Sequence, residues 1–189
     1  MKIIHTTSGY SLIEVLVAVA LLMFAIVGPM TIAVKSSQSS QYARQQTTAF
    51  FLAQEGISIV NTIRNNEALA WANDSRVDAW RWLDDPDLAP CFENYGCNID
   101  FTGASFLSTV TSCEEPEDCQ MQFSETRGRL VYQMRAGDLT PYRRIITLTK
   151  LGIEEEEIQV VSTIQWDTKL LGDSVQTVSQ STSLFHIYK

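Results

Sequence analysis

The feature that most constrains this chain is a run of twenty mostly apolar residues, 15–34, which follows a single carboxylate, Glu14. A helix needs about 20 predominantly apolar residues to cross a bilayer, and only Thr31 and the Gly28-Pro29 pair interrupt this run. We therefore expect residues 15–34 to be inserted in a membrane. Glu14 is the exception, because an ionisable group costs roughly 2.5–3.5 kcal/mol near the bilayer centre and is by default a functional-site hypothesis.

A short leader precedes the apolar run. Residues 1–8 have no apolar core of their own, unlike a secretory signal peptide. The residues that follow, Gly9-Tyr10-Ser11-Leu12-Ile13-Glu14, resemble the prepilin signal of type IV pilins and type II secretion pseudopilins. In that family a membrane-embedded aspartyl peptidase cuts after the glycine and methylates the new amino terminus. The resemblance implies cleavage between Gly9 and Tyr10, methylation of Tyr10, and a role for Glu14 in assembly.

The resemblance also implies a location and a set of partners. The helix would sit in the cytoplasmic (inner) membrane, with the amino terminus inside and the carboxyl-terminal domain outside, and would later enter an extracellular pilus or a periplasmic pseudopilus. Its partners would be other pilin subunits, the prepilin peptidase, the inner-membrane assembly platform and, before assembly, membrane lipid. The positive charge of Lys2 on the leader favours the same orientation. The alternative is an ordinary uncleaved membrane anchor.

Two features of the apolar helix each have two interpretations. Glu14 either pairs with an amino terminus, its own or that of a neighbouring subunit, because buried charges need compensation, or it stays hydrated or protonated at the membrane edge without a specific role. Gly28 and Pro29 weaken a helix. They produce either a static bend or, as the resemblance to pilins whose helices partly unwind on assembly implies, a melting point.

The helix is expected to continue past the membrane. Residues 36–41 are polar but contain neither proline nor glycine, and the chain then regains a helical period. We divide the helix into a membrane and polymerisation half, 10–35, and an amphipathic half, 36–66, with a total length of about 85 Å at 1.5 Å per residue. The apolar face of the second half comprises Ala49, Ala53, Gly56, Val60 and Ile63, widened by Phe50, Ile57 and Ile59. The opposite face carries Gln54, Glu55, Ser58, Asn61 and Arg64.

The region 67–128 lacks a regular period and is expected to be an irregular loop. Its three tryptophans are expected to cover the helix or a sheet edge. All four cysteines lie here, and the first two and the last two each enclose five residues. This spacing favours two local disulfides outside the cytoplasm, each stabilising by about 2 kcal/mol on the chain-entropy model, while three connectivities remain open. The cysteines are Cys91, Cys97, Cys113 and Cys119, and the tryptophans are Trp71, Trp80 and Trp82.

Metal binding is the competing interpretation of this region. Zinc is disfavoured because the cysteine spacing exceeds the usual one and no histidine lies nearby. The acidic residues between Cys113 and Cys119 could offer oxygen ligands to calcium, but they lack the EF-hand pattern with its central glycine. We therefore expect a solvated acidic tip, no bound metal and no cofactor.

From residue 129 to 189 the pattern has a period of two, which predicts strands at about 130–135, 142–151, 158–166 and 175–188. These four strands would form an antiparallel meander with one face on the amphipathic half of the helix. The expected fold is thus α+β, a pilin-like long helix packed on a four-stranded antiparallel sheet. The end of the chain, a tryptophan-terminated strand followed by a strand rich in threonine and serine, also resembles PilV-like minor pilins.

The net charge and the motifs of the chain argue against two classes of function, nucleic-acid binding and enzymatic activity. The chain of 189 residues has a net charge of −8, and loss of Lys2 with residues 1–9 would leave 180 residues and −9, which argues against direct nucleic-acid binding. No nucleophile-base pair, metal cluster or nucleotide-binding loop is visible, so we do not expect an enzyme. The expected function is a structural subunit, a minor pilin or pseudopilin, of a type IV pilus-like filament. The alternative is a type II secretion pseudopilin or a tip or adhesion subunit that binds a surface or substrate through residues 67–128.

Overall fold

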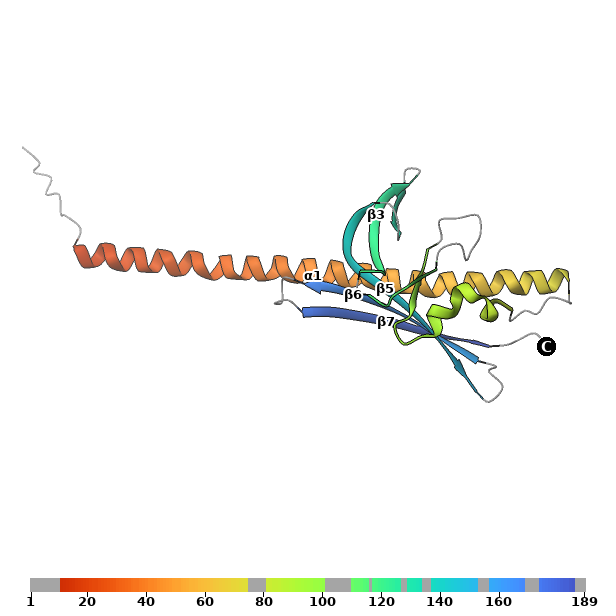
Figure 1. The fold of residues 1–189 in the computed structure, drawn as a ribbon. Coiled ribbons are helices and arrows are strands. Elements are labelled where there is room, and N and C mark those ends of the chain that lie inside the picture. Colours follow the sequence, from red (N-terminus) through yellow and green to blue (C-terminus); the bar gives the residue numbers. More distant parts are fainter. Residues whose placement is uncertain are drawn as a thin grey trace, which may run out of the picture. The chain divides into compact units, whose positions relative to one another are not determined.

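The computed structural model describes residues 11–74, 81–100, 110–115, 117–126, 129–133, 137–152, 157–168 and 174–185. The chain divides into two compact units, Met1–Ala43 and Arg44–Lys189. One helix, α1 (Leu12–Asn73), contributes to both units, and a β-sheet makes up much of the second (Figure 1). The expected α+β class, with a long amino-terminal apolar helix packed on an antiparallel sheet, is confirmed.

Helix α1 ends seven residues later than the expected end at residue 66. The expectation stopped where the apolar period gives way to Asn65 and Asn66. Residues 67–73 contain no glycine or proline and include three alanines, a glutamate and a leucine, which are good helix formers. Intrinsic propensity therefore carries the helix beyond its buried face, and Trp71 belongs to the helix and not to a loop.

Within the described residues the sheet has seven strands rather than the four that we expected. Three lie in the region 67–128, which is therefore only partly irregular. That region also contains two short 3-10 helices, η1 (Arg81–Asp84) and η2 (Pro86–Phe92). The strands are β1 (Cys97–Ile99), β2 (Val110–Ser112), β3 (Gln120–Thr126), β4 (Arg129–Gln133), β5 (Asp138–Leu151), β6 (Glu157–Thr168) and β7 (Ser174–Phe185).

Strand β5 organises the sheet. One of its edges pairs with β6 over ten residue pairs, and β6 pairs in turn with β7, as an antiparallel meander predicts. The other edge is shared, because β3 pairs with residues 138–143 and β1 pairs at Ile146. Strand β4 pairs with β3 and not with β5, so the expected four-stranded meander is wrong at its first step. A strand of fourteen residues has more edge than one short neighbour can fill.

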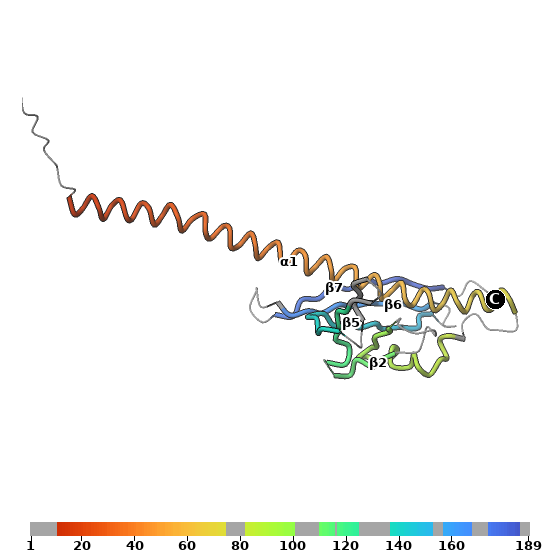
Figure 2. Tube along the Cα trace, turned by 90° about the horizontal axis from the view of Figure 1, so that it is seen from above, coloured from red at the N-terminus to blue at the C-terminus, as the bar shows by residue number. Residues whose placement is uncertain are grey.

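The core of the second unit lies between α1 and the inner face of β5 and β6 (Figure 2). The period of two buries the even-numbered positions of both strands, including the cross-strand pairs Tyr142 with Trp166 and Leu148 with Val160. The helix buries the apolar face that its period predicts, with Leu52 added, whereas Phe50 is exposed. The buried helix residues are Ala49, Leu52, Ala53, Gly56, Ile59, Val60 and Ile63.

The helix approaches the sheet most closely at Gly56. A β-carbon at this position would lie 2.4 Å from Ser162 Oγ, 3.1 Å from Ser162 Cβ and 3.3 Å from Arg144 Cδ. Only a residue without a side chain allows the helix to cross the strands at this distance. A glycine is thus needed at position 56 because it has no side chain. It is not needed for an unusual backbone conformation, since Gly56 lies in regular helix.

Candidate functional site

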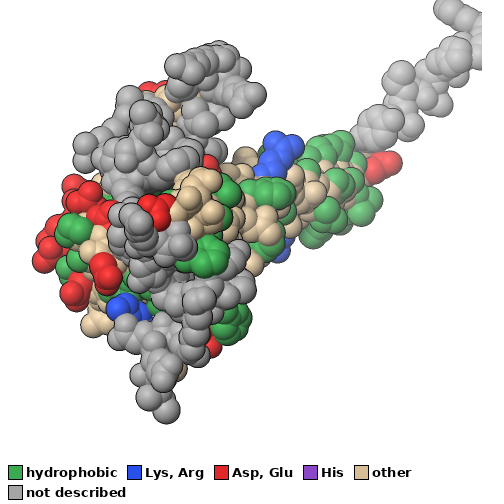
Figure 3. Space-filling view, turned by 90° about the vertical axis from the view of Figure 1, so that its right-hand side faces the viewer, with side chains coloured by type: hydrophobic (Ala, Val, Ile, Leu, Met, Phe, Trp, Pro, Cys, Tyr) green, Lys and Arg blue, Asp and Glu red, His purple; other side chains and the backbone are tan. Residues whose placement is uncertain are grey.

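The first unit presents an apolar surface on every side of the helix. All residues from 11 to 41 are exposed, and they include fifteen large apolar side chains between Leu12 and Val34. Figure 3 shows these apolar side chains covering much of the visible face of the helix. A helix that is apolar all round belongs in lipid or among other helices. By length and composition α1 is long and apolar enough to cross a membrane.

Glu14 lies in the first turn of this helix. The backbone N–H groups of Glu14 and Val15 donate to the carbonyl of Ser11, at 2.9 and 3.2 Å, so Ser11 precedes the first helical residue. A serine before the helix and a glutamate three residues later have the spacing of a capping box, and a carboxylate in the first turn interacts favourably with the helix dipole. Sequence reasoning did not consider this spacing, although it was visible. Gly9 and Tyr10, at which the sequence predicts cleavage and methylation, lie outside the described residues.

The helix is continuous through Gly28 and Pro29. Proline has no N–H with which to reach the carbonyl four residues earlier. Thr31 Oγ1 donates to the carbonyl of Gly28 at 2.8 Å, and beyond the chain neighbours and the local helix backbone no atom lies within 4 Å of where a β-carbon of Gly28 would be. The opening of the helix at this point during assembly stays a prediction.

Two disulfides close short loops in the second unit. Cys91 is bonded to Cys97 and Cys113 to Cys119, the local pairing that the spacing favours, and all four cysteines are buried. The first bond ties η2 to the start of β1, within the main core. The second closes the acidic loop before β3, where Asp118 Oδ2 accepts the N–H of Glu115 at 3.0 Å.

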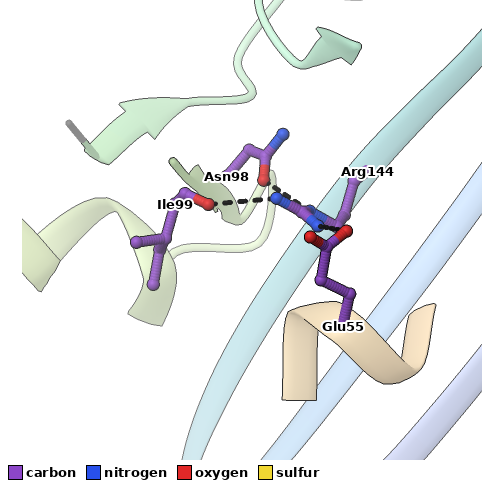
Figure 4. A network of polar contacts seen from close by, with 4 residues as sticks. All are labelled: Glu55, Asn98, Ile99 and Arg144. Carbon is purple, nitrogen blue, oxygen red and sulfur yellow. Dashed lines mark hydrogen bonds and ion pairs between the residues drawn. The ribbon is translucent and has the colours of Figure 1, made fainter. Parts of the chain in front are cut away.

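A buried arginine joins the helix to the sheet (Figure 4). Arg144 of β5 is 2% exposed, and its Nε donates to Asn98 Oδ1 at 2.7 Å. Its Nη1 donates to Glu55 Oε2 of α1 at 3.1 Å, and its Nη2 donates to the carbonyl of Ile99 at 3.0 Å. Burial lowers the pKa of Arg144, and the carboxylates of Glu55 and Asp100 oppose this shift.

Sequence reasoning placed Glu55 on the polar face of the helix with no further role. Its side chain is 47% exposed, so that placement holds for much of the side chain, but the carboxylate reaches inward to the guanidinium of Arg144. The sequence contained one signal that Arg144 is buried. Tyr142 and Ile146, two residues before and after it in β5, both face the core, so Arg144 faces the core too. A charged residue on a buried face needs a partner.

Two further features of the described part of the second unit are a buried tryptophan and a surface hollow. Trp82 is buried in the core, and Trp80 lies outside the described residues. A hollow of about 400 Å³ is lined by Glu117, Gln120, Arg143, Gln165 and Asp167, among others. In the described part of the chain, no three histidine, cysteine, aspartate or glutamate side chains are placed to hold a metal ion.

No protein-family model matches this chain, no curated protein matches it in sequence, and no solved structure matches it.

Proposed function

We propose that this chain is a structural subunit, a minor pilin or a pseudopilin, of a type IV pilus-like filament. A prepilin peptidase cuts it between Gly9 and Tyr10, and it assembles through α1. The observation that carries the proposal is the exposed apolar helix with one carboxylate in its first turn, directly after the prepilin-like residues 9–14.

The exposed apolar surface suits the helix to two successive environments, first the lipid bilayer and then a bundle of helices in the filament. Burying its fifteen large apolar side chains is worth on the order of 20 kcal/mol or more, so the segment does not remain in water. Lipid tails are as apolar as leucine, and transfer from lipid to a bundle of helices therefore gains little from apolar burial. Another interaction must favour the filament over the bilayer.

Glu14 supplies that interaction. In the bilayer its carboxylate is costly to keep charged, and in a bundle of helices it can pair with an amine that cleavage creates at Tyr10 of a neighbouring subunit. Cleavage after Gly9 would leave this amine four positions before Glu14, so that each subunit carries a donor and an acceptor near the same end of its helix. The pair then selects the axial register between subunits.

The test uses the full chain, expressed together with a prepilin peptidase and the assembly machinery. Glu14→Ala and the uncharged isostere Glu14→Gln are both expected to insert in the membrane and to be cleaved, but to fall at least about tenfold in filament incorporation. Glu114→Gln is the matched control, because it makes the same chemical change at an exposed position of the second unit. Normal incorporation of the Glu14→Gln chain would contradict charge pairing.

The narrower alternatives, a type II secretion pseudopilin or a tip subunit with a binding region at residues 67–128, use the same helix. Much of that region forms helix, strand or buried core and not an exposed binding loop. Residues 67–73 extend α1, and η2 and β1 contribute Leu88, Cys91, Cys97 and Ile99 to the buried core. We therefore propose the structural role first.

A further inference from the structure

Strand β7 forms one border of the sheet. In the described part of the chain it pairs with β6 alone, over twelve residue pairs in one unbroken register (Figure 1). In an antiparallel pair, every second residue directs its backbone N–H and C=O groups away from the partner strand. Strand β7 therefore presents a row of backbone donors and acceptors that no strand among the described residues fills.

This edge lacks the features that keep the border of a sheet from pairing with another chain. Such features are a short strand, charged residues, proline or a bulge. The other border strands are short, since β2 has three residues and β4 has five. Strand β7 has twelve residues, and its sequence SVQTVSQSTSLF contains neither a charged residue nor a proline. Its register with β6 contains no bulge, so β7 is a long and regular edge.

A groove of about 310 Å³ lies between α1 and β7. It is lined by one residue of β7, Gln180, and by four of α1, Gln54, Ile57, Ser58 and Asn61. Three of these side chains are amides, one is a hydroxyl and none is charged. Gln180 belongs to the inner face of β7, which is mostly half-buried, whereas the inner face of β6 is fully buried under α1. The helix thus leaves much of the inner face of β7 uncovered.

The outer face of β7 indicates which side chains a further strand would carry. Its exposed residues include Thr177, Ser179 and Ser181. A pair of hydroxyls already joins the two strands on this face, with Thr163 Oγ1 2.9 Å from Ser179 Oγ. Serine and threonine pairs across strands stabilise a sheet. A further strand with small hydroxyl side chains extends this row, and β7 offers no charge to pair with a charged one.

We propose that the free edge of β7 binds an extended, uncharged segment of another polypeptide, with serine or threonine on its outer face. The segment adds to the sheet as a further strand. Its backbone pairs with β7, and its inner side chains lie beside the amides of Gln54 and Asn61. A row of alternating backbone donors and acceptors matches an extended backbone and not a compact ligand. The inference concerns residues 44–189 and does not depend on the filament proposal.

The probe is a fluorescent peptide with the sequence of β7, residues 174–185, which has the proposed composition. It is titrated into the full chain in detergent micelles, below the concentration at which the peptide self-associates. We expect saturable binding by fluorescence anisotropy. A control peptide carries Thr177→Pro, Ser179→Pro and Ser181→Pro, which keep its length and charge but remove backbone donors. It should bind at least about tenfold more weakly.

A variant of the chain tests the groove. Gln54→Ala should weaken binding of the β7 peptide about fivefold, because it removes an amide that can hydrogen-bond to the added strand. The side chain of Gln54 is exposed, so the urea midpoint of the chain should not change. Gln41→Ala is the matched control, since it removes an exposed amide of α1 that does not line the groove, and it should leave binding unchanged.

Amide hydrogen exchange, followed by NMR at residues 177–183, distinguishes strand addition from other binding. In the free chain, every second amide should exchange rapidly, because β6 protects only the alternate set. The bound peptide should protect the rapid set as well. Absence of saturable binding, or binding that leaves the rapid set unprotected, would overturn the proposal. Protection of both sets before the peptide is added would also overturn it, because another part of the chain or a second copy would then fill the edge.

Discussion

The substitution Gly56→Ala tests the close crossing of helix and sheet. Two opposing effects decide whether this substitution raises or lowers the free energy of unfolding. Alanine is favoured over glycine inside a helix by about 1 kcal/mol. Against this, the added methyl group would lie 2.4 Å from Ser162 Oγ and 3.1 Å from Ser162 Cβ, and Ser162 is fully buried on a strand paired on both sides.

At these distances the steric cost of the added methyl group exceeds the gain in helix propensity. Overpacking of a well-filled core costs about 1–3 kcal/mol. We take the upper value because the Cβ of Ser162 stays 3.1 Å away even if its hydroxyl rotates, and strand β6 is paired on both sides. The helix must shift away, which also lengthens the 3.1 Å contact between Glu55 and Arg144. The net expectation is a loss of about 2 kcal/mol, or roughly a thirtyfold fall in the folding equilibrium constant.

The assay is urea unfolding of the full chain in detergent, followed by tryptophan fluorescence, since Trp82 and Trp166 are both buried. With a slope of about 2 kcal/mol per molar urea, the midpoint falls by about 1 M. Gly28→Ala is the control, because the added carbon meets no atom within 4 Å beyond its chain neighbours and the local helix backbone, and it should not lower the midpoint. Ser162→Ala should partly rescue Gly56→Ala. An unchanged or raised midpoint for Gly56→Ala would refute the close-packing account.

Three further predictions concern the arginine and the helix. Arg144→Lys keeps the charge but cannot reach all three acceptors, so we expect a loss of about 2–3 kcal/mol in unfolding experiments; a change below about 0.5 kcal/mol would contradict the network. Gly9→Leu should block cleavage, seen as a larger mass for the intact chain, and a normal mature mass would place the cut elsewhere. Pro29→Ala should stiffen α1 and reduce filament incorporation without altering membrane insertion, whereas unchanged incorporation would favour a static bend.

Much of the fold could be predicted because local periodicity dominates it. The buried face of α1 and the alternation of β5, β6 and β7 follow from steps of three and four in the helix and of two in the strands. The disulfide pairing follows from short spacing. These features depend on residues that are close together in the sequence.

The rest depends on contacts between distant residues. Strands β1 and β2 are three residues long, too short to show a period, and they form because β5 offers them an edge. The pairing of β3 with β5 could not be predicted from the sequence. Strand β4 lies between them in the chain, and we expected β4 to pair with β5, whereas it pairs with β3. Arg144 and Glu55 are separated by 89 residues, so the sequence could suggest that Arg144 needs a partner but not which residue it is.

The central claim, that the chain is processed as a prepilin, is tested most directly by the mass of the amino-terminal peptide of the protein isolated from its native membrane. We expect a peptide that begins at Tyr10 and carries a methyl group on its amino terminus. A peptide that begins at Met1, from cells with an active prepilin peptidase, would contradict the account and leave an ordinary membrane-anchored domain.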